Sequence, residues 1–206
     1  MTRQPVAAKP QTGPAVAKGL AALGVAPGAA SAVAFGVSAA VAKALPAALG
    51  VQSIPAIDSL SDLEGDFDLI VVGEGVATLG LAETRNRVAE LALRLRPGGE
   101  LAAWLSTLAA PLDGVTPAAA YDALLFPEPA SAGDLGEAAR ATTLSASGWM
   151  MLFHACGLEC VAQAGLGESP LPDSVAVTHA PRLAAFDPVE LTTGRFLARF
   201  RRRGDA

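Results

Sequence analysis

Residues 66–106 constrain the fold more than any other part of this 206-residue chain. The continuous apolar run at residues 69–72 is bounded by turn signals, which predicts a strand buried on both faces. Residues 81–95 alternate apolar and charged positions at helical spacing, which predicts an amphipathic helix. A Pro-Gly-Gly turn at 97–99 leads to a second apolar strand at 101–105. A strand, a helix and a second strand in this order predict a right-handed parallel crossover.

The residues before this unit continue the alternation of helices and strands. Helices are predicted over residues 15–24 and 39–49, and strands over residues 32–36 and 51–57. Ser38 is placed to cap the second helix, and Gly50 follows its end. This alternation predicts an α/β fold, in which a doubly wound, mostly parallel sheet has helices on both faces.

The pattern changes after residue 107. A helix is predicted over residues 148–155 with Ser147 as its cap, and a strand over 158–164. Residues 174–178 predict a further strand. The connection between these two strands is too short for a crossover helix, so we expect them to pair antiparallel. The sheet should therefore end in an antiparallel hairpin.

Three segments are predicted along the chain. Residues 1–14, rich in proline, are expected to form a flexible leader, and residues 15–186 the α/β domain. Within the domain, residues 111–148 are poorly patterned and hold four prolines, which is typical of an insert or lid. Residues 187–206 are predicted to be a basic C-terminal tail, either a helix or a mobile end. The arginines of the tail are Arg195, Arg199, Arg201, Arg202 and Arg203.

Composition limits the class of protein. A net charge of −5 disfavours a nucleic-acid partner. The two cysteines argue against a disulfide scaffold and favour a reducing, cytoplasmic location. The alanine-rich run at residues 29–42 is the nearest approach to a membrane segment. At 14 residues it is shorter than the roughly 20 that a spanning helix needs, so no transmembrane span is expected.

Four short motifs occur in the order found in one enzyme family. The run Phe-Asp-Leu-Ile-Val-Val at 67–72 is followed by Leu-Arg-Pro-Gly-Gly-Glu-Leu at 95–101. Ala-Cys-Gly-Leu-Glu-Cys-Val at 155–161 and Pro-Asp-Ser-Val-Ala-Val at 172–177 come next. Together they resemble the fourth strand, the fifth-strand entry, the last helix-to-strand junction and the final hairpin strand of class I S-adenosylmethionine-dependent methyltransferases. The resemblance covers about residues 30–182 and implies that family's sheet.

The half of the chain that should hold the cofactor departs from the family pattern. Family members carry a strand ending in an acid, then a glycine-rich turn that approaches the methionine end of the cofactor. Residues 33–39 offer only Gly36 and no preceding acid. A further family acid binds the ribose hydroxyls, and Asp58 could be that acid, or the acid after the third strand. The N-terminal half is about one helix and one strand short. The resemblance implies S-adenosylmethionine, but this half favours a chain with no bound cofactor.

Two other residues are candidates for chemistry. Glu74 lies between two glycines at the end of the strongest strand, where it could serve as a general base or substrate contact. His179 follows the last predicted strand and could act as a general base. His154, Cys156 and Cys160 lie close in sequence, but Gly157 separates the cysteines and no fourth ligand is evident, so no metal site is predicted.

Two functions follow from these observations. The first is a methyltransferase-like protein with a degenerate cofactor site that is non-catalytic and acts as a binding or assembly subunit. The alternative is an active methyltransferase on a small metabolite, with an atypical cofactor turn. A partner would be another protein or a second copy of this chain. Residues 51–74 hold six acids and no lysine or arginine, so in a second copy they could receive the basic tail.

Overall fold

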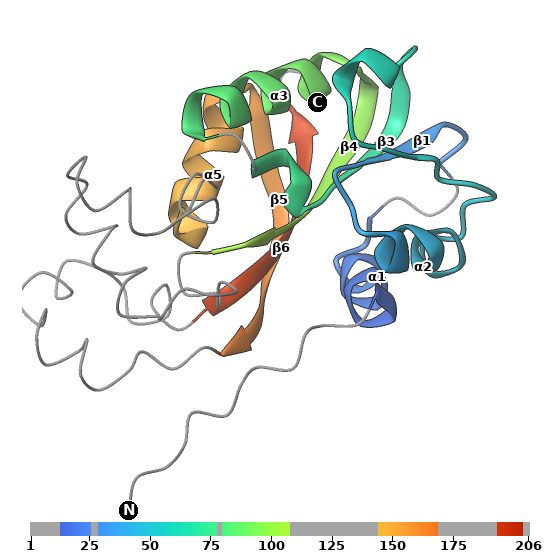
Figure 1. Cartoon of the computed structure of the whole chain (residues 1–206), viewed down its shortest axis with the longest axis horizontal. Coiled ribbons are helices and arrows are strands. Elements are labelled where there is room, and N and C mark those ends of the chain that lie inside the picture. The colour runs from blue at the N-terminus through green and yellow to red at the C-terminus, as the bar shows by residue number, and fades with distance from the viewer. Residues whose placement is uncertain (1–12, 26–28, 78–79, 108–143, 169–192, 204–206) are drawn as a thin grey trace, which may run out of the picture.

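A computed structural model shows one sheet with helices on both faces (Figure 1). It describes residues 13–25, 29–77, 80–107, 144–168 and 193–203. Six strands lie in the order β2-β1-β3-β4-β6-β5. The first four run parallel, and β6 is antiparallel to both of its neighbours. The predicted fold class, a mostly parallel sheet that ends in an antiparallel hairpin, is confirmed.

The first half of the sheet is built as the sequence predicts, apart from one shortened strand. Its elements are α1 (Gly13–Ala22), β1 (Ala32–Phe35), α2 (Ala39–Leu49) and β2 (Ala56–Ile57). Gly50 ends α2 in the left-handed conformation at φ +66°, and its N–H donates to Pro46 O. The strand expected over 51–57 is only two residues long. It is nevertheless an end strand of the sheet.

The central crossover also follows the prediction. The 3-10 turn η1 (Leu60–Asp62) leads to β3 (Phe67–Val72), and the 3-10 turn η2 (Glu74–Ala77) leads to α3 (Leu81–Leu93) and β4 (Leu95–Ser106). β3 and β4 pair in parallel from Leu69 opposite Glu100 onward. The last four residues of β3 are fully buried, as a strand covered on both faces requires.

The C-terminal part contains two corrections. Helix α5 (Ala146–Ala155) is capped by Ser145, whose hydroxyl accepts from Gly148 N at 3.1 Å, and not by Ser147. β5 (Leu158–Glu168) pairs antiparallel with β6 (Thr193–Arg202). The prediction of a helix or mobile basic end for this region was wrong, because β6 lies inside the sheet between β4 and β5. The strand predicted at 174–178 lies outside the described residues.

Side chains that alternate between the two faces of the sheet pack into two separate cores. Leu69, Val71 and Trp104 point to the face covered by α1 and α2. Ile70, Leu105 and Phe200 point to the opposite face, which α3 and α5 cover (Figure 1). Phe200 stacks on Phe153 of α5 with ring centroids 4.4 Å apart. β6 therefore supplies core residues to both layers and is part of the folded domain.

The helices that the structure describes include none with the length and apolarity needed to cross a membrane.

Candidate functional site

The connections between strands locate the place where this kind of sheet usually binds ligands. From β1 the chain passes through α2 to β2 on one side, and β3 then pairs on the other side of β1. The carboxyl ends of β1 and β3 are therefore the topological switch point. Ligands of open α/β sheets bind in the crevice at such a point.

The turns that follow β1 and β3 are in direct backbone contact at this switch point. Gly73 N donates to Phe35 O at 2.9 Å, and Gly75 N donates to Gly36 O at 2.8 Å. A Cβ on Gly36 would lie 2.8 Å from Gly75 Cα, and a Cβ on Gly75 would lie 2.7 Å from Gly36 Cα. Gly36 also has φ +61°, which favours glycine. The glycines thus allow two stretches of protein backbone to meet.

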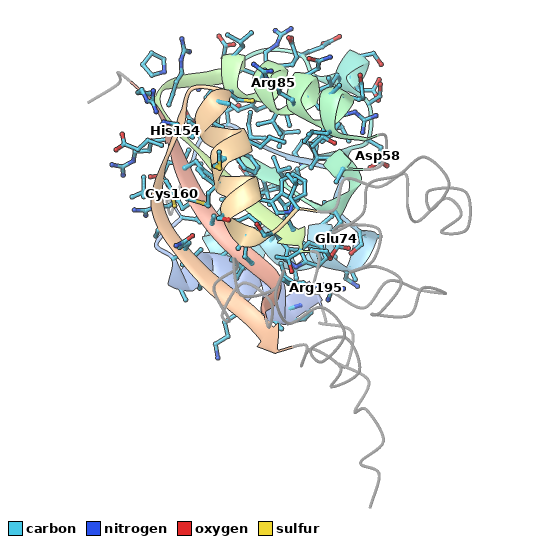
Figure 2. The ribbon with its side chains drawn as sticks, turned by 90° about the vertical axis from the view of Figure 1, so that its left-hand side faces the viewer. Asp58, Glu74, Arg85, His154, Cys160 and Arg195 are labelled. Atoms are coloured by element: carbon cyan, nitrogen blue, oxygen red, sulfur yellow. The ribbon has the colours of Figure 1, made fainter. Side chains whose placement is uncertain are left out.

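Glu74 projects from the same turn into a polar cluster. Its carboxylate accepts a hydrogen bond from the Ser106 hydroxyl at the end of β4. Arg195 Nε of β6 lies 3.3 Å from the same carboxylate. Figure 2 shows Glu74 and Arg195 next to each other. The cluster links η2, β4 and β6 at the carboxyl edge of the parallel strands.

Two tryptophans contact this cluster. Trp149 Nε1 of α5 donates to Ser106 O at 2.9 Å, and the Arg195 guanidinium lies 5.7 Å from the Trp104 ring centroid. Trp104 Nε1 is buried and has no hydrogen-bond partner in the part of the chain that the structure describes. Glu74 is held by an arginine and a hydroxyl. It can therefore orient neighbouring groups or accept a hydrogen bond from a ligand. Its role as a general base stays a prediction.

Sequence reasoning singled out Glu74 but missed Ser106 and assigned Arg195 to the tail. A signal was present for both. Ser106 is the first polar residue after the apolar run of β4, and Arg195 begins an alternation of arginines with apolar residues.

This chain resembles known proteins in its fold and not in its sequence. No family model matches the sequence, and no curated protein matches it. Solved structures do match. CcbJ methyltransferase from Streptomyces caelestis aligns with a TM-score of 0.54 at 11% identity, covering 98% of this chain and 94% of its own. N-methyltransferase NodS from Bradyrhizobium japonicum WM9 gives 0.50 at 15% identity, covering 91% and 94%.

A third match comes from an assembly. A chain of the complex between the Haloferax volcanii Trm112 methyltransferase activator and a methyltransferase aligns with a TM-score of 0.51 at 17% identity, covering 91% of this chain and 89% of its own. The chain has the class I methyltransferase fold. These identities are too low to transfer an activity.

The methyltransferase fold implies S-adenosylmethionine as a ligand. Whether the residues at the switch point fit this cofactor depends on the space beside Gly36. The methionine end of that cofactor needs open space beside the glycine turn after β1. Here the backbone of Gly75 and Val76 lies where even a Cβ on Gly36 would clash. On the side where a Gly36 side chain would project, backbone of the second turn therefore fills the space, and the methionine end does not fit there.

Asp58 is the candidate for the family's ribose-binding acid. It directly follows β2, which pairs with β1, so it ends the second strand and not the third. Its side chain is exposed (Figure 2). A role in cofactor binding stays a prediction for Asp58, as it does for Gly36.

The other candidate residues are dispersed. His179 lies outside the described residues. His154 contacts the Arg203 guanidinium, Cys156 Sγ donates to Arg85 O at 3.6 Å, and Cys160 Sγ donates to Ala162 O at 3.5 Å. Burial raises the pKa of both thiols above the usual range, which makes them poorer metal ligands at neutral pH. Among the described residues no three potential ligands gather around one point.

The arginines assigned to the tail contact groups within the fold. Arg199 and Arg201 reach the buried carboxylate of Glu100 at 3.9 and 2.9 Å. Arg199 also donates to Gly24 O at the end of α1. Arg202 donates to Leu95 O at 3.4 Å, and Arg203 contacts His154. These arginines therefore interact with groups of their own chain. Their contact with an acidic surface of another molecule stays a prediction.

Proposed function

We propose that this chain is a non-catalytic protein with a methyltransferase fold, which acts as a binding or assembly subunit. The observation that carries the proposal is the backbone contact between Gly36 and Gly75 at the topological switch point. A ligand bound there would have to separate these two turns and break the hydrogen bond from Gly75 to Gly36. Catalysis of methyl transfer needs the sulfonium group held at that point.

An assembly role is supported by one of the structural neighbours. That neighbour comes from a complex in which Trm112 is named as a methyltransferase activator, so a chain of this fold can work beside a protein partner. For the present chain we propose a protein partner, with self-association as the second form of assembly. We also propose a cytoplasmic location, because Cys156 and Cys160 are free thiols.

A second function is favoured by one specific observation. Asp58 ends the second strand, where the resemblance to class I methyltransferases implies the acid that binds the ribose hydroxyls. An active S-adenosylmethionine-dependent methyltransferase on a small metabolite would use Asp58 and would open the contact between Gly36 and Gly75. Residues 111–148 would then be the lid.

Thermal unfolding separates the two functions. A ligand that binds only the folded state stabilises it by about 2.7 kcal/mol at 100 times its Kd. The assembly proposal expects no change in Tm with saturating S-adenosylmethionine or S-adenosylhomocysteine. A rise of several degrees with either would favour the enzyme. Light scattering tests assembly: the chain isolated from its native cells should have a mass above that of one copy, and a strict monomer would contradict the proposal.

A further inference from the structure

The outer side of β2 exposes backbone groups that can pair with another strand. β2 is an end strand of the sheet, and β1 is its one described neighbour. Ala34 N donates to Pro55 O at 2.9 Å, and Gly36 N donates to Ile57 O at 3.0 Å, so Pro55 and Ile57 face β1. Because successive residues of a strand face opposite sides, the N–H and C=O of Ala56 face outward.

The usual protection of an end strand does not cover this position. Proline often blocks such strands because it has no N–H to donate. Pro55, however, faces β1, so its missing N–H leaves the outward groups of Ala56 intact. Ala56 is exposed and carries a small side chain, which leaves room for a strand beside it.

Unpaired negative charge lies next to this strand. Asp58, Asp62, Glu64 and Asp66 lie on the connection that leaves β2, and all four are exposed. None of them has an ion-pair partner among the described residues, whereas the neighbouring Asp68 is paired with Arg96 at 3.2 Å. The basic segment expected to neutralise them is β6, whose arginines contact other groups in the fold. These exposed carboxylates are therefore available to basic side chains of another molecule.

We infer that β2 and these four carboxylates, together the acidic edge, bind an extended lysine- or arginine-containing segment of a partner protein. The segment would add a strand beside Ala56 through main-chain hydrogen bonds. Its basic side chains would meet the carboxylates and select this partner over neutral or acidic ones. The inference rests on the proposed assembly function, for which it names the surface and the chemistry of the partner.

A labelled peptide tests this surface in the full-length chain. The probe is a fluorescein-labelled octapeptide of alternating lysine and valine, with alternating glutamate and valine as the peptide control, and fluorescence anisotropy gives the Kd. Ala56→Pro removes the outward N–H and should weaken binding about tenfold, which corresponds to about 1.4 kcal/mol. Ala56→Val keeps the N–H and should bind like the wild type.

A matched pair of charge variants tests the carboxylates. Asp62→Asn/Glu64→Gln should weaken binding of the lysine peptide several-fold. Glu83→Gln/Glu90→Gln changes the net charge equally, but on α3, and should leave the Kd unchanged. Asp58 is left intact in both, so cofactor binding through Asp58 would not alter the comparison.

Several results would overturn the inference. Equal affinity of the wild type and Ala56→Pro for the lysine peptide would mean that the peptide is held by general charge attraction and not by strand pairing. If Ala56→Pro does not fold, a lysine peptide with every second amide N-methylated replaces it, and unchanged affinity for that peptide has the same meaning. A dimer that Asp62→Asn/Glu64→Gln dissociates would make a second copy the occupant. Peptide binding that appears only after deletion of residues 1–12 would make the chain's own leader the occupant. Since no arm of the experiment uses S-adenosylmethionine, failure here is distinguishable from failure of the non-catalytic proposal.

Discussion

At the scale of single residues, Gly36 and Gly75 allow the turns after β1 and β3 to touch at the switch point. Gly36 was predicted as a glycine that approaches a ligand, and in the structure it approaches Gly75. The requirement for glycine is the same in both cases, so the sequence could identify the residue but not what it contacts. The partner depends on the parallel register of β1 and β3, which places Phe35 opposite Val72.

Gly36→Ala should be strongly destabilising, and Gly50→Ala supplies a matched control. Both glycines have positive φ, at +61° and +66°, so both alanines bear a left-handed cost of about 1–2 kcal/mol. Only at Gly36 would the new Cβ meet backbone, since nothing lies within 4 Å of a Cβ at Gly50. Urea denaturation should therefore show a larger loss of unfolding free energy for Gly36→Ala. Equal losses would mean that the two turns separate easily, as an active methyltransferase would need.

Glu74→Gln tests whether the carboxylate anchors β6 through Arg195. The pair with Arg195 is partly solvated, with side-chain exposures of 39% and 25%, so its charge contributes about 0.2–1 kcal/mol. We expect Glu74→Gln to lower the unfolding free energy by that amount and to have no effect once Arg195→Gln is present. A double-mutant cycle measures this. Additive losses from the two variants would remove the anchor role.

At the scale of elements, the sequence was most informative where each segment decides its own structure. Helix α2 is bounded by Ser38 and Gly50, and β3 is an uninterrupted apolar run, so both were predicted closely. β6 was missed because its arginines resemble a solvated end. These arginines form ion pairs with Glu100 and Glu74, which are distant in sequence. The apolar residues at every second position, Phe196, Ala198 and Phe200, were the available strand signal.

The Glu100 carboxylate should be essential for holding β6 beside β4. It is 4% exposed and contacts Arg199 and Arg201. Glu100→Ala leaves the mostly buried Arg199 without its anion, and breaking a buried pair typically costs about 3–5 kcal/mol. Urea denaturation should show a loss of that size, and Arg199→Met in the same chain should restore part of it. A loss below about 1 kcal/mol would indicate that the pair is effectively solvated.

Asp68 should make the stability depend on pH in the acid range. Partial burial would raise its pKa, but hydrogen bonds from Ser31 N and Arg96 outweigh that effect and lower it. A carboxyl group with a lowered folded pKa stabilises the protein above its unfolded pKa, about 3.9, and the stabilisation is lost as the pH falls below it. The difference in urea midpoint between wild type and Asp68→Asn should therefore narrow from pH 6 to pH 3. Arg96→Gln should reduce this pH dependence, and a constant difference would contradict the assignment.

At the scale of the whole molecule, the strand order brings the turns after β1 and β3 together at the switch point. The order of elements could be predicted from the sequence, because strands and helices alternate there. The contact between the two turns could not, since it requires two glycine-containing turns, 39 residues apart in the chain, to meet in register. The position of the acidic connection at an edge of the sheet could not be predicted either, because the sequence alone does not show that β2 is an end strand.

Isothermal titration calorimetry with S-adenosylmethionine and S-adenosylhomocysteine measures whether the switch point holds the cofactor. If the contact between Gly36 and Gly75 closes the switch point, neither compound should bind with a Kd below about 1 mM, which corresponds to about −4.1 kcal/mol. For both ligands we expect heats equal to those of dilution in the full-length chain. Binding of either compound at one site per chain with a micromolar Kd would contradict it.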